Sequence, residues 1–322
     1  MKLFLKKILF FVLPLFVLVI MMDFYLENMN SLYKEKAEGL KKDAHEIEIL
    51  ILGNSHATYG VNPDYFTDYA FNIANVGQSI FFDKALTLQN IEALEKLKYV
   101  FISLDYHSLY FSSQRGERNI WSYFGNGLKH PSEDYDKANI SPFLFGYDPR
   151  VSFSLMKKDI LNKWKFRDHP HHLNFDTEVG VIKTDTLVKG FVSFSGTEPY
   201  VFNSIYYTNR IIGFDNLINN STAKELVLNE LDELISTLQR KGVKTIFYAT
   251  PLFKEYISFL DTTIIQENNK IAKILCEKYN MEFWNYAIQH DFTKSEFYNP
   301  DHLNKEGAKR FTKILNSRLL KK

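Results

Sequence analysis

Two short stretches near opposite ends of the sequence contain residues that could perform nucleophilic chemistry. In the first, an apolar run ends at Gly53, and Asn54 and Ser55 follow directly. A serine two residues beyond a glycine at a strand end sits on a tight turn, where backbone N–H groups can face an oxyanion. Gly-Asn-Ser is also common turn chemistry, so this stretch alone does not establish a nucleophile.

The second stretch could supply the base that such a serine needs. Asp301 and His302 come just before a C-terminal helix that Asn304 is expected to cap, and Gly307 and Ala308 allow close packing at its start. A histidine held there can lie over the same sheet edge as the serine. A histidine near a helix start is more often a capping or surface residue, so the two stretches must be interpreted together.

The elements that would position these residues alternate between strand and helix patterns. Short apolar runs resemble strands buried on both faces of a parallel sheet, and they lie at 47–52, 98–104, 243–251 and 281–286. Helical patterns lie between or after them, at 82–97, 222–242, 262–280 and 304–322. We therefore predict an α/β fold, a three-layer α/β/α sandwich with a doubly wound, flavodoxin-like parallel sheet, whose active groups lie at the carboxyl ends of the strands.

The alternation breaks between about 110 and 215. This stretch is rich in aromatic residues, Ser, Asn and His, and we interpret it as an inserted cap on a domain that spans 46–322. Three of its histidines, His169, His171 and His172, invite a metal. Adjacent histidines rarely converge without a fixed strand or helix, and no carboxylate pair follows at a recognised spacing, so we expect no metal and no cofactor.

The N-terminal residues form a different kind of segment. Three lysines precede an uninterrupted apolar run at 8–22, which Asp23 closes. As a helix this run measures about 22 Å, and its flanks can supply the rest of a bilayer's hydrocarbon core of about 30 Å. A cleaved signal peptide is the alternative, but no small-x-small cleavage site follows.

We favour an uncleaved signal anchor over residues 1–28, followed by a stalk at 29–45. Positive residues before the span place the N-terminus in the cytoplasm and the C-terminal domain outside it, which predicts a single-pass protein of the cell membrane.

Charge and cysteine content exclude other classes. The sequence has 39 Lys and Arg against 38 Asp and Glu, and no basic run interleaved with aromatics, so we expect no nucleic-acid partner. Cys276 is the single cysteine, which excludes a disulfide framework and a thiolate metal site.

Together the two ends resemble the SGNH, or GDSL-type, hydrolase family. The first block of that family is Gly-Asp-Ser, which corresponds here to Gly53, Asn54 and Ser55. The last block is Asp-x-x-His, followed in many members by Leu-Asn and a Gly-Ala helix start, and it corresponds to His302, Leu303, Asn304, Gly307 and Ala308. The resemblance covers most of 46–108 and 243–320.

The resemblance also implies the donors of an oxyanion hole. A glycine block after the second strand corresponds to Asn72, Ala74, Asn75 and Gly77, so the amides of Ser55 and Gly77 would hold the oxyanion. A third donor, an Asn after the next strand, is missing. Asp105 only accepts hydrogen bonds when ionised, whereas His107 could donate.

The sequence departs from the family again at the acid. The family has Asp three residues before the histidine, where this chain has Asn299, and Asp301 is adjacent to His302 instead. Asn stabilises imidazolium far less than a carboxylate does. Therefore either Asp301 takes the place of the missing carboxylate, or the site is a Ser-His dyad. Neighbouring polar residues are expected to contact substrate: Asn54, His56, Asn75, Gln78 and Asp105.

The resemblance implies acyl transfer through an acyl-serine intermediate, with no cofactor. An N-terminal anchor combined with these blocks resembles bacterial cell-surface members that are associated with membrane acyltransferases and act in D-alanylation or O-acetylation of envelope polymers. We therefore expect a serine esterase or O-acyltransferase that acts on acetyl or alanyl esters of an envelope glycopolymer. The alternative is a non-catalytic protein that keeps the fold and binds a polysaccharide or a membrane-bound O-acyltransferase.

Overall fold

The computed structural model describes residues 2–29, 31–111, 121–128, 149–165, 187–219, 222–288 and 291–322. Much of the predicted insertion, including His169, His171 and His172, lies outside the described residues. The chain divides into two compact units, each described by itself below. The smaller comprises Met1–Lys34 with Arg115–Ile182, and the larger comprises Glu35–Gln114 with Lys183–Lys322.

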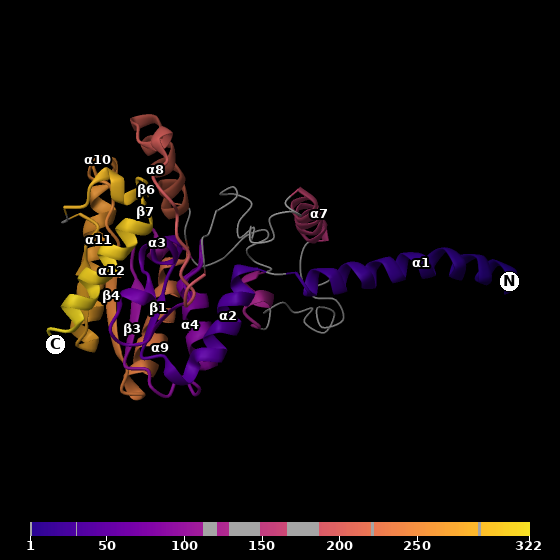
Figure 1. The fold of residues 1–322 in the computed structure, drawn as a ribbon, viewed down its shortest axis with the longest axis horizontal. Coiled ribbons are helices and arrows are strands. Elements are labelled where there is room, and N and C mark those ends of the chain that lie inside the picture. Colours follow the sequence, from indigo (N-terminus) through magenta and orange to yellow (C-terminus); the bar gives the residue numbers. More distant parts are fainter. Residues whose placement is uncertain are drawn as a thin grey trace. The chain divides into compact units, whose positions relative to one another are not determined.

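A five-stranded parallel sheet forms the centre of the larger unit (Figure 1). Its strands are β1 (Ile49–Leu52), β2 (Ala70–Asn72), β3 (Tyr99–Ser103), β4 (Lys244–Ala249) and β5 (Glu282–Asn285), in the order β2-β1-β3-β4-β5. All four residues of β1 are buried, which is why this strand is apolar without alternation. The predicted α/β fold with a parallel sheet and flanking helices is confirmed.

Helices cover both faces of this sheet. The strand order reverses direction once, so right-handed crossovers place α4 (Ile80–Asn90), α9 (Lys224–Arg240) and α11 (Thr262–Tyr279) on one face. The other face carries α3 (Ser55–Gly60) and α12 (Lys305–Leu319), which pack against each other. Ile49 and Ile51 point toward this second face, where they share a core with Phe311 and Leu315.

Shorter elements complete the larger unit. They are η1 (Ala44–Glu46), η2 (Pro63–Tyr65), η3 (Ser108–Tyr110), η5 (Pro199–Val201), α8 (Ser204–Asn219), α10 (Lys254–Ile257) and η6 (Lys294–Glu296). A two-stranded antiparallel ribbon, β6 (Phe297–Asn299) with β7 (His302–Leu303), leads directly into α12. Helix α2 (Leu32–Asp43) lies between α1 and η1 in the sequence.

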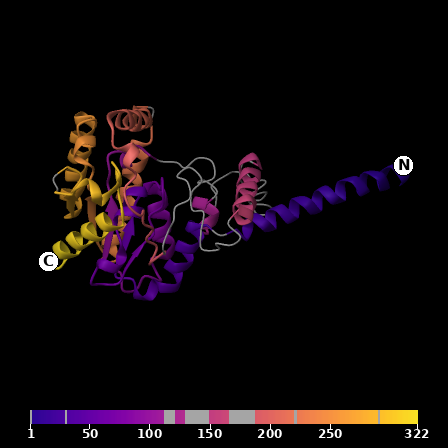
Figure 2. The ribbon, with the colours of Figure 1, turned by 45° about the horizontal axis from the view of Figure 1, so that its top comes forward.

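The smaller unit contains α1 (Lys2–Glu27), the five-residue π-helix η4 (Trp121–Gly125) and α7 (Pro149–Lys165), shown from a second direction in Figure 2. Within α1, the segment Lys6–Glu27 is long and apolar enough to cross a membrane, by length and composition. Large side chains such as Phe10, Phe11 and Phe16 are exposed along it. The helix is therefore a candidate membrane anchor, and its orientation stays a prediction.

Candidate active site

Ser55 stands at the carboxyl edge of the sheet because of the two residues before it. Gly53 follows β1 with φ of 136°, and a Cβ there would lie 2.5 Å from Ser103 Cβ, so the position requires glycine. Asn54 caps α3, because its Oδ1 accepts a hydrogen bond from His56 N at 2.9 Å. Ser55 is consequently the first residue of α3.

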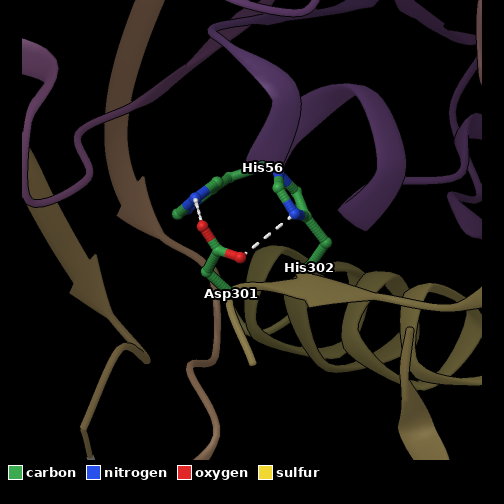
Figure 3. Close-up of side chains that lie close together, drawn as sticks. All are labelled: His56, Asp301 and His302. Atoms are coloured by element: carbon green, nitrogen blue, oxygen red, sulfur yellow. Dashed lines mark ion pairs between the residues drawn. The ribbon is translucent and has the colours of Figure 1, made fainter. Parts of the chain in front are cut away.

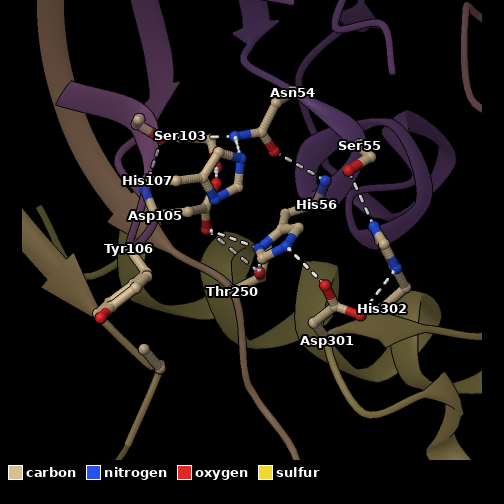
Figure 4. Close-up of polar contacts among 12 residues, drawn as sticks. Asn54, Ser55, His56, Ser103, Asp105, Tyr106, His107, Thr250, Asp301 and His302 are labelled. Carbon is tan, nitrogen blue, oxygen red and sulfur yellow. Dashed lines mark hydrogen bonds and ion pairs between the residues drawn. The ribbon is translucent and has the colours of Figure 1, made fainter. Parts of the chain in front are cut away.

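His302 reaches Ser55 from the other end of the chain (Figure 4). The distance between His302 Nε2 and Ser55 Oγ is 2.8 Å. Asn304 caps α12 through hydrogen bonds from Glu306 N and Gly307 N, both 3.1 Å. A Cβ at Gly307 would lie 2.0 Å from Glu296 O, so glycine lets the start of α12 approach the segment before β6. These contacts place His302 over the sheet edge.

Asn299 fixes the tautomer of His302. Its Oδ1 accepts hydrogen bonds from Asp301 N at 3.2 Å and His302 N at 2.8 Å, so the atom at this position must be the oxygen. The same oxygen lies 3.0 Å from His302 Nδ1, which therefore carries a proton. The lone pair of Nε2 is left to accept the hydroxyl proton of Ser55, as a general base requires.

Asp301 lies beside the imidazole but is held mainly by Arg210. Its Oδ1 is 3.3 Å from His302 Nδ1, while Arg210 of α8 places Nε and Nη2 at 2.9 and 2.8 Å from Oδ2. Burial favours the neutral acid, but the charge of Arg210 and the interactions with His302 and His56 together outweigh it and hold the pKa of Asp301 well below its usual range. Asp301 is therefore a buried, ionised carboxylate next to the base.

His56 lies between two carboxylates, as Figure 4 shows. Its Nδ1 is 3.1 Å from Asp105 Oδ1, and its Nε2 is 3.8 Å from Asp301 Oδ2. Burial opposes protonation, yet Asp105 and Asp301 together raise the pKa of His56 to about 9. For Asp105, burial is outweighed by the charge of His56 and by hydrogen bonds, and its pKa falls to about 2. His56 is thus a buried cation at neutral pH.

His302 remains neutral in this setting. Burial lowers the pKa of His302 below 6.5, and the neighbouring charge of Asp301 only partly opposes that effect. The base is therefore unprotonated at neutral pH, while Asp301 is in place to stabilise the imidazolium that forms during proton transfer.

The three side chains of Figure 3, His56, Asp301 and His302, are close enough to share a metal ion, with one ligand atom from each lying within 4.8 Å of the others. Their contacts already have another explanation. Arg210 and His56 balance the charge of Asp301, and both ring nitrogens of His302 have hydrogen-bond partners. We therefore interpret the cluster as a proton-transfer site rather than a metal centre.

The predicted glycine block lies against the turn at 53–55, which carries Ser55. Asn75 N donates to Gly53 O at 3.3 Å, and Gly77 adopts a φ of 67°. The side chains of Asn75 and Gln78 are buried and hydrogen-bonded to each other at 3.1 Å. They support the loop from within, a setting that differs from the substrate contact expected for them.

Asp83 connects this loop to the turn at 53–55 through hydrogen bonds. It was not identified from the sequence. Its Oδ1 accepts from Gly53 N at 3.0 Å and from Gln78 Nε2 at 2.7 Å. Burial raises the pKa of Asp83 to about 7, although these two hydrogen bonds act in the opposite direction. Its only sequence signal is an acidic residue in the first turn of α4.

Asp83→Asn should stabilise the protein at alkaline pH and leave it unchanged at pH 4. The pKa of Asp83 is about 7 in the folded protein and 3.8 in the unfolded chain. The contribution of this carboxyl to the free energy of unfolding is therefore fully present below pH 3.8, and it is lost as pH rises through 7. Asparagine keeps the accepting oxygen, so we expect a gain of about 4 kcal/mol in the free energy of unfolding at pH 8. Thermal unfolding at both pH values measures it.

The control is Asp83→Ala, which removes the accepting oxygen and should destabilise at both pH values. An equal effect of Asp83→Asn at pH 4 and pH 8 would contradict a buried, titrating carboxyl.

His107, the expected third oxyanion donor, contacts Asn54. Asn54 Oδ1 is occupied by His56 N, so the Nδ2 that lies 3.4 Å from His107 Nε2 is the donor and this ring nitrogen accepts. Burial and the charge of His56 lower the pKa of His107 to about 3, so the ring is neutral and its proton is on Nδ1. Nδ1 is buried without a partner among the described residues. The ring of His107 stacks on that of Phe214, with 4.5 Å between the ring centroids.

The structure therefore brings together Ser55, His302, Asn299 and Asp301, and it adds Arg210, which the sequence did not indicate. His56 and Asp105 contact each other, and both also line a small cavity, so their contact with substrate stays a prediction. An isolated arginine in a segment without clear periodicity gives no signal from which its contact with Asp301 could be found.

Comparisons with known proteins give a similarity of fold only. No protein-family model matches the chain, and no curated protein sequence matches it. A solved structure from Streptococcus pneumonia, provisionally described as a platelet activating factor, is 12% identical with a TM-score of 0.39, over 88% of this chain and 91% of that chain.

A provisionally described acylhydrolase from Bacteroides fragilis NCTC 9343 is 11% identical with a TM-score of 0.40, over 92% of this chain and 97% of that chain. Similarity at this level supports no inference about activity, so the proposal below depends on the geometry of the site.

Proposed function

We propose that this protein is a membrane-anchored serine hydrolase that cleaves or transfers the acyl group of carboxylic esters. One observation carries the proposal: Ser55 Oγ lies 2.8 Å from a neutral, buried imidazole whose tautomer leaves Nε2 free to accept its proton. An activated serine of this kind performs acyl transfer through a covalent intermediate.

In the first half of the reaction, Ser55 Oγ attacks the ester carbonyl carbon while its proton passes to His302 Nε2. The carbonyl oxygen becomes an oxyanion, which we assign to the amides of Ser55 and Gly77. Asp301 stabilises the new imidazolium, and Asn299 keeps its ring in place. His302 then gives the proton to the departing alcohol, which leaves an acyl group on Ser55.

In the second half, His302 takes a proton from an acceptor hydroxyl as that oxygen attacks the acyl-serine, and returns it to Ser55 as the ester to the enzyme breaks. With water as the acceptor the protein is an esterase, and with a sugar hydroxyl it is an O-acyltransferase. The candidate span in α1 favours substrates outside the cytoplasm, and we propose acetyl or alanyl esters of a cell-envelope glycopolymer. A membrane-bound O-acyltransferase is the proposed partner.

Covalent labelling of the full-length protein by a fluorophosphonate probe tests the proposal. We expect one adduct on Ser55, located by peptide mapping, that is absent from Ser55→Ala and strongly reduced in His302→Ala. Ser236→Ala, a half-buried serine of α9 remote in sequence from the site residues, serves as the matched control and should label like the unaltered protein. A folded protein that takes no label at Ser55 would favour the non-catalytic alternative, a protein that binds polysaccharide or a membrane acyltransferase.

A further inference from the structure

Helix α7 contacts α1 where the candidate span ends. Tyr25 Oη donates to Asp159 Oδ2 at 2.6 Å, and Met156 packs against the cluster of Leu26, Met29 and Tyr33. The apolar part of α1 ends just before this region, at Asp23. Figure 2 shows α7 running across the axis of α1 rather than along it. If α1 crosses a bilayer, α7 consequently lies along the bilayer surface.

One side of α7 exposes large apolar side chains. The exposed fractions are 54% for Phe153, 46% for Ile160, 51% for Leu161 and 73% for Trp164. The last three follow Phe153 by seven, eight and eleven residues, which puts all four within about 100° of one another around the helix. Met156, which contacts α1, borders this face, and Asp159, which also contacts α1, lies on the opposite side of the helix. A soluble surface rarely groups such residues, so the face requires an apolar environment.

The charges of α7 identify that environment. Its sequence contains five Lys or Arg residues against one acid, Asp159, which is bonded to Tyr25. Arg150 and Lys157 are exposed, and they fall within the same sector of the helix as the apolar residues. A helix whose exposed sector combines Trp, Phe and aliphatic side chains with long basic side chains is suited to the boundary between lipid headgroups and acyl chains.

We propose that α7 is an interfacial helix, which inserts Phe153, Ile160, Leu161 and Trp164 below the lipid headgroups while its basic residues bind anionic headgroups. The proposal rests on the anchoring of α1 in the membrane, which is part of the proposed function. It adds a second contact surface, in which the smaller unit lies on the bilayer instead of being tethered by the span alone.

Depth-dependent quenching tests this contact in the full-length protein, reconstituted into vesicles that contain phosphatidylglycerol. Cys276→Ser removes the single cysteine, and Ile160→Cys then carries an environment-sensitive fluorophore. We expect a blue-shifted emission that lipids brominated near the carbonyl end of the acyl chain quench. The same label at Leu226→Cys, exposed on α9, is the control and should stay water-like and unquenched.

A label at Phe16→Cys separates the two hypotheses. If lipids brominated deep in the acyl chain quench Phe16→Cys while Ile160→Cys resembles the control, the span stands and the interfacial helix is wrong. If neither label is quenched, the hypothesis that α1 anchors the protein in the membrane is wrong as well. A blue-shifted but unquenched Ile160→Cys that depends on protein concentration indicates a second protein chain on this face and also overturns the proposal.

Intrinsic fluorescence provides a measurement without labels. The sequence has three tryptophans, so comparison with Trp164→Phe isolates the emission of Trp164. This emission should shift to the blue on reconstitution, and the shift should be larger with phosphatidylglycerol than with phosphatidylcholine alone. An unchanged spectrum in both lipids would contradict insertion of the helix.

Discussion

Ser55→Ala is expected to lower the rate of ester hydrolysis about a million-fold, the scale at which removal of an activated serine leaves only binding and oxyanion stabilisation. His302→Ala should cost nearly as much, because the Ser55 proton then has no acceptor. Hydrolysis of p-nitrophenyl acetate by the full-length protein measures both rates. Neither change should unfold the larger unit, whose core is formed by other residues.

A variant that combines Ser55→Ala with His302→Ala provides the sharper test. Because the two side chains act as one unit across a 2.8 Å contact, the combined loss should be close to that of either single variant rather than their product. Losses that multiply would mean that the residues act independently, and the proposed proton transfer would be wrong. Ser236→Ala should hydrolyse the ester at the unaltered rate.

Asp301→Asn is expected to slow turnover about a thousand-fold, because it removes the carboxylate that stabilises imidazolium. Asn299→Ala should cost far less, about ten-fold, since Asp301 Oδ1 at 3.3 Å can still accept the Nδ1 proton. The two residues therefore have different roles: Asn299 supplies the hydrogen bond and Asp301 supplies the charge. Steady-state kcat for both variants measures this difference.

The pH dependence distinguishes these roles. The unprotonated base is the active form, so kcat/KM should fall as pH drops through the pKa of His302, which burial keeps below 6.5. The charge of Asp301 raises that pKa, so Asp301→Asn should move the acidic limb to lower pH, whereas Asn299→Ala should not. An unmoved limb in Asp301→Asn would show that the carboxylate does not act on His302. Asn299→Asp is the conservative control and should keep most activity.

The parts of the fold that depend on local pattern could be predicted from the sequence. A parallel sheet buried on both faces produces continuous apolar runs, so β1, β3, β4 and β5 were located to within a few residues. Gly53 and Gly307 indicated close packing, and the structure shows which atoms a Cβ at each position would clash with. Ser55 and His302 were found because a turn after a strand and a turn before a helix both carry local signals.

The remaining parts of the site depend on contacts between distant segments. Arg210 lies 91 residues from Asp301 in the sequence, and the helix that carries it shows only a weak apolar face. Asp83 resembles any acid in the first turn of a helix until folding buries it beside Gly53. The position of His56 next to Ser55 suggested contact with substrate, and nothing local reveals that Asp105 and Asp301 lie on either side of it.

The separation of hydrogen bond and charge between Asn299 and Asp301 affects how relatives of this chain would be recognised. A pattern that demands a carboxylate three residues before the histidine would pass over any chain built in this way. The better signature is Asn-x-Asp-His together with a distant arginine, because a carboxylate moved next to the histidine needs its own counter-ion. A related chain with a neutral residue in place of Arg210 should therefore have Asp at position 299 or lack the acid at position 301.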